Sequence, residues 1–179
     1  MKEGMVQKKR AKFGIMLKIV AIGFIPMLIL AVSEAAFSAK TIRGGMRDEA
    51  IKRLEDITVG MQEALGVAGE GDYHAEGDIM YKGEHNIAED LQAFQAFADF
   101  SEIDLTVCWG DTRMVTTLAD PDTGESMAGT QVAETVAKNV LQDGMEYTDT
   151  DMMINGEPYF CCYIPLKNSD GSIVGMIFA

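Results

Sequence analysis

Arg113 is the residue best suited to binding a small anion, because no other arginine follows Arg53 in the chain. It lies at the start of an expected strand, directly after a Gly-Asp turn. Alternation along that strand would put Arg113, Val115 and Thr117 on one face. A guanidinium binds a carboxylate through two parallel hydrogen bonds, and the Thr117 hydroxyl would add a third. This pattern predicts a site for a small carboxylate.

Aromatic and acidic residues near this strand would complete the site. On another expected strand, alternation puts Tyr159 and Tyr163 on one side, which we interpret as a pocket wall. Trp109 and Asp111 flank the turn before Arg113 and could close over the ligand, with Asp111 binding an amino group if the ligand has one. The predicted ligand is an organic acid or an amino acid. The predicted ligand-binding residues are Trp109, Asp111, Arg113, Thr117, Tyr159 and Tyr163.

Each of these residues also has a structural interpretation. Arg113 could pair with Asp111 or with another of the 28 acidic residues. Threonines suit a strand whether or not a ligand is present, and the two tyrosines could lie at the edge of the core. The position of each side chain relative to Arg113 decides between the two interpretations.

The sequence gives little support for catalysis, a cofactor or a metal. His74 and His85 lie in a loop-rich stretch without the spacing of zinc ligands. No serine or cysteine motif accompanies His74 to form a triad, and no glycine-rich loop opens a helix toward a phosphate. We therefore expect a protein that is not an enzyme and has no cofactor or metal. An extracellular hydrolase using His74 is the alternative.

Cys108, Cys161 and Cys162 do not form a disulfide framework, because their number is odd and two of them are adjacent. We expect them to be small core residues. A disulfide from Cys108 to Cys161 or Cys162 across neighbouring strands is the alternative.

The N-terminal residues predict a membrane anchor. Residues 1–12 form a basic tail, and the predicted membrane helix, residues 13–33, is apolar from Phe13 to Val32 except for Lys18. About 20 helical residues span roughly 30 Å, the thickness of the hydrocarbon core. The basic tail would stay in the cytoplasm and residues 34–179 would lie outside the cell membrane. A cleaved signal peptide, which would leave a secreted binding module, is the alternative.

The chain beyond residue 18 is strongly acidic. Residues 1–18 contain six of the 15 bases and one of the 28 acids, which leaves nine bases and 27 acids, a net charge of −18. Such a surface repels nucleic acid, so nucleic acid is excluded as a partner. An anion would bind only in a pocket where a local base outweighs this field.

Hydrophobic periodicity predicts one α+β domain after the membrane span. Apolar residues recur every three or four positions from Ile42 to Leu65, which indicates a long helix over residues 34–67 that continues the membrane helix. Its apolar face could form a homodimer contact near the membrane and pack on a sheet farther along. Other helices are predicted from Asn86 to about Phe100 and from Thr130 or Gln131 to Gln142. Strands are predicted over residues 79–82, 104–109, 112–118, 146–154, 159–166 and 172–178, the last five in one antiparallel sheet.

Three segments resemble the single-Cache extracytoplasmic domain of bacterial methyl-accepting chemotaxis proteins. They are DLTVCWGDTRMVTTL from Asp104 to Leu118, Gly129-Thr130, and INGEPYFCCYIPLKNSDGSIVGMIFA from Ile154 to Ala179. The resemblance covers residues 13–179 in element order. It implies a long helix packed on a PAS-like sheet, and a ligand sensor followed by a second membrane span and a cytoplasmic signalling module. Neither later part is present, so we interpret the chain as an N-terminal fragment.

The sequence therefore predicts a transmembrane chemoreceptor fragment in which a small ligand shifts the long helix. The expected partners are that ligand, the membrane and a second copy of the chain. The same sensor could control a histidine kinase or a cyclic-dinucleotide synthase, because the output module is not in this sequence.

Overall fold

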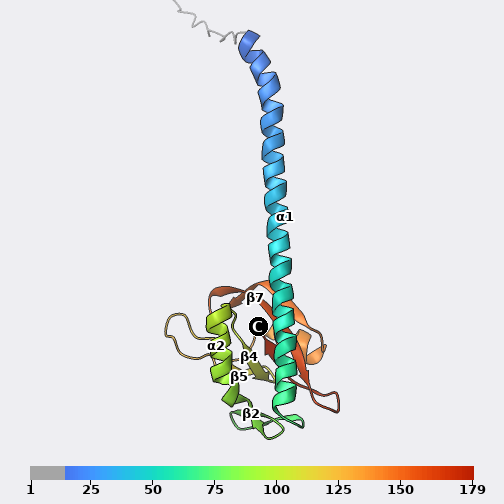
Figure 1. Ribbon diagram of the computed structural model, residues 1–179, viewed down its shortest axis with the longest axis vertical. Helices are drawn as coiled ribbons and strands as arrows, with labels where there is room; N and C mark the ends of the chain where they lie inside the picture. The colour runs from blue at the N-terminus through green and yellow to red at the C-terminus, as the bar shows by residue number, and fades with distance from the viewer. Residues whose placement is uncertain (1–14) are drawn as a thin grey trace, which may run out of the picture. The chain divides into compact units, whose positions relative to one another are not determined.

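The computed structural model describes residues 15–179 and divides the chain into two compact units, Met1–Met46 and Arg47–Ala179. The predicted basic tail, residues 1–12, lies outside the described residues. Helix α1 runs without a break over Ile15–Ala68 (Figure 1). The long helix predicted over residues 34–67 lies within α1, which ends one residue beyond the predicted boundary.

The predicted membrane span covers residues 13–33. Residues 13 and 14, and the side chains of residues 15–26 and 28, lie outside the description. Within the part of the chain that is described, no helix is long and apolar enough to cross a membrane.

The second unit contains a five-stranded antiparallel sheet with the strand order β5-β4-β8-β7-β6. The β4–β5 hairpin joins the β6–β7–β8 strands through β8, where Thr106 lies opposite Phe178 and Trp109 lies opposite Gly175. This sheet confirms the predicted α+β class and the five predicted antiparallel strands. The strands are β4 (Thr106–Trp109), β5 (Thr112–Thr116), β6 (Tyr147–Ile154), β7 (Glu157–Lys167) and β8 (Ile173–Phe178).

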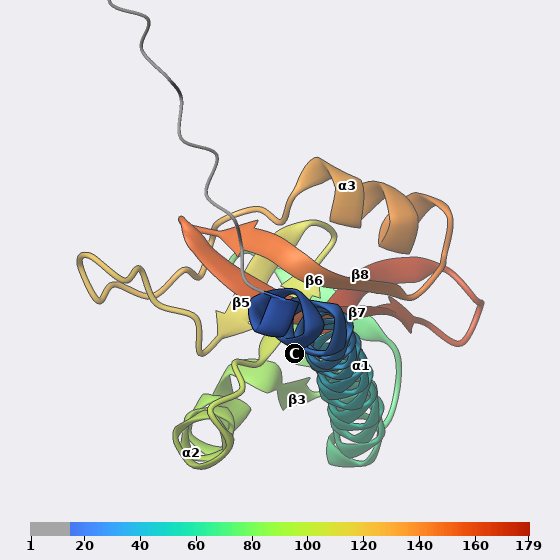
Figure 2. The ribbon, with the colours of Figure 1, turned by 90° about the horizontal axis from the view of Figure 1, so that it is seen from above.

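Each face of the sheet packs against its own hydrophobic core. On one face, Leu54, Met61 and Leu65 of α1 pack with Val107 and Ile164 of the sheet. The other face packs against α3 (Glu134–Ala137) and the π-helical turn η2 (Lys138–Gln142), as Figure 2 shows. The sheet residues of this second core include Cys108, Tyr163, Met176 and Phe178.

A small three-stranded sheet and a short helix precede the main sheet. The strands of the small sheet are β1 (Tyr73–Glu76), β2 (Ile79–Lys82) and β3 (His85–Asn86). The sequence predicted only β2 of these three. The predicted helix from Asn86 is observed as η1 (Ile87–Asp90) followed by α2 (Leu91–Ser101). The Asn86 side chain accepts a hydrogen bond from the Ala88 amide at 3.0 Å, which confirms its capping role.

The helix predicted from Thr130 or Gln131 begins later, at Glu134. Residues 130–132 are extended beside β5 instead. The Arg113 amide donates to the Thr130 carbonyl at 2.9 Å, and the Val132 amide donates to the Asp111 carbonyl at 2.9 Å. The predicted start was wrong because these long-range backbone hydrogen bonds use groups that a helix would need.

Candidate functional site

A β-bulge in β5 separates Arg113 from Val115 and Thr117. Val115 pairs with Val107, whereas Arg113 pairs with Cys108, so Met114 is an extra residue in the strand. Val115 packs in the core on the α1 side, and Cys108 belongs to the core on the α3 side. The predicted common face of these three residues was wrong, because one extra residue shifts the alternation of side chains.

The Arg113 side chain is buried, with 5% of its surface exposed. Its Nη1 donates to the Thr130 hydroxyl at 2.9 Å and to the Gln131 carbonyl at 2.6 Å. The ion pairs among residues 15–179 join Arg47 to Asp151 and His85 to Asp90, and neither includes Arg113. The ion pair between Arg113 and Asp111, which was the structural alternative, is therefore not observed among these residues. Arg113 is thus a buried cation without a counter-ion in the described part of the chain.

A pocket of about 250 Å³ lies beside Arg113, between residues 127–133 and the β6–β7 hairpin. Its lining combines polar and apolar side chains, and Arg113 is the only formally charged residue among its described lining residues. The polar lining residues are Arg113, Thr130, Gln131, Asn155 and Tyr163. The apolar lining residues are Met127, Val132, Ala133, Met152, Met153 and Ile154.

Tyr163 of β7 brings a neutral hydroxyl to the pocket. Its ring is 2% exposed and packs against Phe178, with the ring centroids 4.8 Å apart. Burial raises the pKa of Tyr163 strongly, the Cys161 thiol adds to this rise, and the Arg113 guanidinium lowers it. The phenol therefore stays protonated at neutral pH and can donate a hydrogen bond to an anion.

Asp111 and Tyr159 lie near the pocket but do not line it. The Asp111 Oδ2 atom accepts a hydrogen bond from the Gln131 Nε2 atom at 3.2 Å, so Asp111 positions a lining residue. Tyr159 shares a face of β7 with Cys161 and Tyr163, as the alternation predicted, and packs at the margin of the same core.

Trp109 and Thr117 lie away from the pocket. Trp109 packs against the core on the α1 side of the sheet. The Thr117 hydroxyl donates to the Asp104 carboxylate at 2.8 Å and accepts from the Leu105 amide at 2.9 Å. The structure therefore brings together Arg113 and Tyr163 of the six predicted site residues, with Asp111 bonded to the lining.

Two stretches of the pocket wall were missed from the sequence, residues 127–133 and the hairpin residues 152–155. The first follows β5 only because of the backbone bonds to Arg113 and Asp111. The second ends at the Asn155-Gly156 turn, where both residues have positive φ. That Asn-Gly pair predicts a hairpin, but no local signal indicates that the hairpin faces Arg113.

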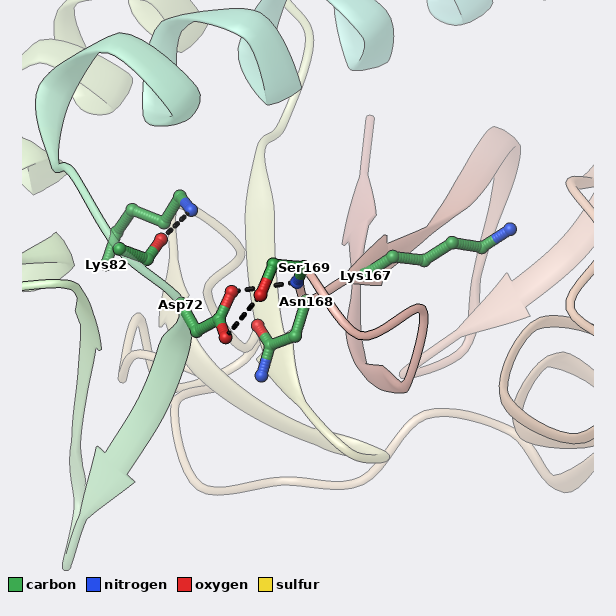
Figure 3. A pocket seen from close by; sticks show the side chains of 6 residues that line it. Asp72, Lys82, Lys167, Asn168 and Ser169 are labelled. Atoms are coloured by element: carbon green, nitrogen blue, oxygen red, sulfur yellow. Dashed lines mark hydrogen bonds between the residues drawn. The ribbon is translucent and has the colours of Figure 1, made fainter.

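Figure 3 shows another pocket, of about 440 Å³, between the small sheet and the β7–β8 turn. Its polar groups bond to one another: Asp72 accepts from the Ser169 amide and hydroxyl at 2.8 and 2.9 Å. Lys82 donates to the Gly71 carbonyl and lies over the Tyr73 ring. Lys167 points away from Asp72 in Figure 3. These contacts join two parts of the domain, so the Arg113 pocket is the better candidate for a ligand.

The three cysteines are buried and free. Strand β8 lies between β4, which carries Cys108, and β7, which carries Cys161 and Cys162. Neighbouring strands are about 4.8 Å apart, so strands two positions apart are too distant for a disulfide. Cys161 and Cys162 also face opposite cores. The alternative of a Cys108 disulfide is not observed.

Among the described residues, no group of His, Cys, Asp or Glu side chains could hold a metal ion.

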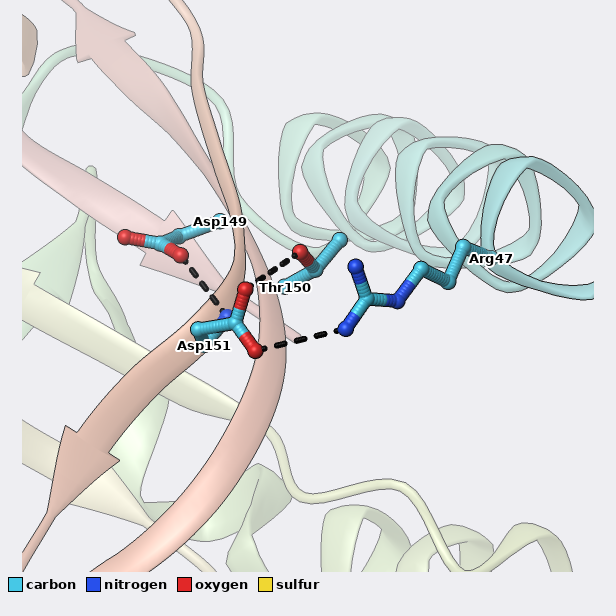
Figure 4. A network of polar contacts seen from close by, with 4 residues as sticks. All are labelled: Arg47, Asp149, Thr150 and Asp151. Carbon is cyan, nitrogen blue, oxygen red and sulfur yellow. Dashed lines mark hydrogen bonds and ion pairs between the residues drawn. The ribbon is translucent and has the colours of Figure 1, made fainter. Parts of the chain in front are cut away.

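The strand that lines the pocket also contacts α1. The pairing of β6 with β7 is irregular between Asp149 and Met152, and Asp151 lies in that interval. Asp151 accepts from the Arg47 guanidinium of α1 at 3.4 Å (Figure 4), and that guanidinium lies 5.9 Å from the centroid of the Phe160 ring. Because Met152 lines the pocket, one short stretch of β6 connects the pocket with α1.

The family model of single cache domain 3 matches residues 85–179. The match covers more than half of the chain and includes every described residue that lines the Arg113 pocket. Among curated proteins, none matches this chain.

Proposed function

The chain belongs to the single cache domain 3 family, a class of extracellular modules that sense small molecules, and from this premise we propose that the Arg113 pocket binds a small carboxylate. The ligand is an organic acid or an amino acid whose carboxylate meets the guanidinium. The Tyr163 hydroxyl donates a further hydrogen bond to the carboxylate.

The observation that supports this ligand class is the burial of Arg113 without a counter-ion among the described residues. Removing a guanidinium from water costs several kcal/mol, and an anion in excellent geometry offsets that cost. The hydrogen bonds that the Arg113 side chain donates to Thr130 and Gln131 both use Nη1, and Arg113 lines the pocket together with Tyr163. A guanidinium fits a carboxylate through two parallel hydrogen bonds, and we expect the other N–H groups of Arg113 to make them.

Calorimetric titration of the full chain with carboxylates and amino acids tests this proposal. We expect binding by at least one of them, and we expect Arg113→Gln to weaken it at least about tenfold, because a buried charge-assisted pair is lost. Arg53→Gln removes the same charge from an exposed position on α1 and should leave the affinity unchanged. Equal affinities in the wild-type and Arg113→Gln proteins would exclude the Arg113 pocket as the site.

We propose that ligand binding reaches α1 through Asp151. Closure of the β6–β7 hairpin on a ligand would move Asp151 and Phe160 against Arg47, and a shift of about 1–2 Å is the usual scale for helix signals at interfaces. Hydrogen exchange of residues 47–58 should change when ligand is added. Asp151→Asn should reduce that change while ligand still binds, and an undiminished change would rule out this route.

We also propose that residues 13–33 anchor the sensor in the cell membrane, that two copies contact each other along α1, and that the output is chemotaxis. Described apolar side chains in this region support the anchor, since Met27, Ile29, Leu30 and Val32 are each at least 60% exposed. Met46, which belongs to the predicted apolar face of α1 and is 68% exposed, supports a contact between copies. Cell fractionation with N-terminal sequencing tests the anchor: a soluble protein cut near residue 36 would contradict it.

A further inference from the structure

Helix α2 carries a second apolar face, on the side that points away from the core. Phe94 packs against the core on the α1 side of the sheet and Ala98 is buried, so these two residues belong to the inner face. Figure 2 shows α2 at the periphery of the Arg47–Ala179 unit. The outer face is exposed, and its residues recur at the i, i+3, i+4 and i+7 spacing of one helical face: Ala93, Ala96, Phe97 and Phe100.

This outer face leaves aromatic surface in water. Phe100 is 90% exposed and Phe97 is 37% exposed. One leucine, three alanines and three phenylalanines make up seven of the 11 residues of α2, and Asp99 is its one charged residue. A helix that is apolar on most sides is normally buried, and an exposed cluster of apolar side chains marks an interaction site. We therefore expect a partner to cover the outer face.

Acidic side chains surround the outer face of α2. Residues 83–112 contain seven Asp and Glu residues and no Lys or Arg. Glu89 and Glu102 lie next to the two ends of the helix, Asp99 lies within it, and all three are exposed. The ion pairs among residues 15–179 include none of these three carboxylates. The outer face is thus an apolar patch inside a negative field.

This field decides which kind of partner fits the outer face. A second copy that used the same face would place its acids opposite these acids, because a two-fold contact pairs a surface with itself. An anionic lipid surface would be repelled as well. A protein surface that combines apolar side chains with lysines or arginines complements both the apolar patch and the surrounding charge.

We infer that the outer face of α2 docks an amphipathic helix of a basic partner protein. The apolar side of that helix packs on Phe97 and Phe100, since residues at this spacing form the ridges that one helix offers to another. Its lysines or arginines lie near Asp99 and Glu102. No residue of α2 is among the described lining residues of the Arg113 pocket, so this inference does not depend on the proposed carboxylate site.

Fluorescence anisotropy with labelled model helices tests the inference on the full chain. The probe is an amphipathic peptide of leucine and lysine, about 18 residues long, which exceeds the length at which isolated helices are marginal. One control peptide has glutamate in place of each lysine. Another has the leucine–lysine sequence scrambled so that no apolar face forms. We expect the probe to bind at least about tenfold more tightly than either control, because only the probe matches both the apolar patch and its charge.

A pair of variants tests the apolar contact. Phe100→Ser should weaken probe binding at least about tenfold, because the most exposed aromatic side chain of the outer face is lost. Since Phe100 is 90% exposed, this replacement should leave the fold intact. Ile79→Ser removes an apolar side chain that is 41% exposed on β2, and it should leave the affinity unchanged.

A second pair of variants tests the charge. Asp99→Lys and Glu63→Lys each replace an exposed helical acid with a base, so they change the net charge of the chain equally. Asp99→Lys should weaken probe binding at least about fivefold more than Glu63→Lys, because only Asp99 belongs to α2.

Several results would overturn the inference. They are equal affinities of the wild-type and Phe100→Ser proteins for the probe, equal affinities of the two charge variants, and binding of either control peptide as tight as that of the probe. Sedimentation that shows a dimer lost in Phe100→Ser would assign the outer face to a second copy instead. Binding to phosphatidylglycerol vesicles that is weakened in Phe100→Ser would assign it to lipid, and either result would also overturn the inference.

Discussion

Arg113 is the residue on which the proposed anion site depends. The residue is 5% exposed, and burying a positive charge is costly unless an anion lies close to it. Thr130 and Gln131 satisfy Nη1 through oxygen atoms that carry no formal charge. A bound carboxylate would supply the missing counter-charge and should therefore stabilise the folded protein by mass action.

Thr117 has a structural role on the other side of the β5 bulge. Its hydroxyl satisfies the buried Leu105 amide and donates to Asp104. Thr117→Val should lower the free energy of unfolding by about 1–3 kcal/mol, because a buried amide loses its partner. Urea denaturation measures this loss, and Thr117→Ser, which keeps the hydroxyl, should lose less. The affinity for a carboxylate that binds the wild-type protein should not change; a loss of binding at unchanged stability would place Thr117 in the site.

At the scale of elements, the sheet depends on a close approach of β8 to β4. A Cβ atom on Gly175 would lie 2.0 Å from the Cys108 carbonyl oxygen and 3.0 Å from its carbonyl carbon. Both contacts involve backbone, which cannot rotate away. The β4–β8 pairing joins the two groups of strands, so its geometry decides whether there is one sheet with two faces.

Gly175→Ala should therefore destabilise the domain by about 1–3 kcal/mol or more, because the strands must move apart. Gly60→Ala provides the matched control. Gly60 lies within α1, and no neighbouring atom comes within 4 Å of the place that a Cβ atom would occupy. Alanine there should stabilise the protein by about 0.5–1 kcal/mol through helix propensity. Thermal melting of both variants checks the pair, and a harmless Gly175→Ala would show that β4 and β8 can separate freely.

At the scale of the whole molecule, buried thiols connect stability to pH. Cys108, Cys161 and Cys162 are each 0% exposed, and burial raises the pKa of each thiol from 9.0 to about 12. Above pH 9 the unfolded chain loses these protons while the folded chain keeps them. The unfolded state then binds fewer protons, so stability falls as pH rises.

We expect the free energy of unfolding to be insensitive to these thiols below pH 9 and to decrease between pH 9 and 12. Each thiol contributes a slope of about 1.4 kcal/mol per pH unit once the unfolded group is ionised. Urea denaturation at about pH 7, 8, 9 and 10 measures the decrease. Cys161→Ala should show a shallower decrease than the wild-type protein, whereas an identical profile would mean that Cys161 ionises alike in both states.

The sequence by itself determined the long helix and the five strands of the main sheet. The three-to-four residue spacing from Ile42 to Leu65 predicted the long helix, and β-branched runs separated by turn residues predicted all five strands of the main sheet. Arg113 could be chosen from the sequence because no other arginine follows Arg53. The alternation along β7 placed Tyr159 and Tyr163 on one face. These are local patterns, and secondary-structure periodicity is a local property.

Only the tertiary structure decided what surrounds Arg113. The bulge at Met114 moved Thr117 to the opposite face, and residues 130–132 became extended instead of helical. Both features depend on hydrogen bonds between residues far apart in the sequence, for example from Val132 to Asp111 and from Thr117 to Leu105. A local pattern contains no record of such partners, so the pocket could be assigned only once the fold had brought them together.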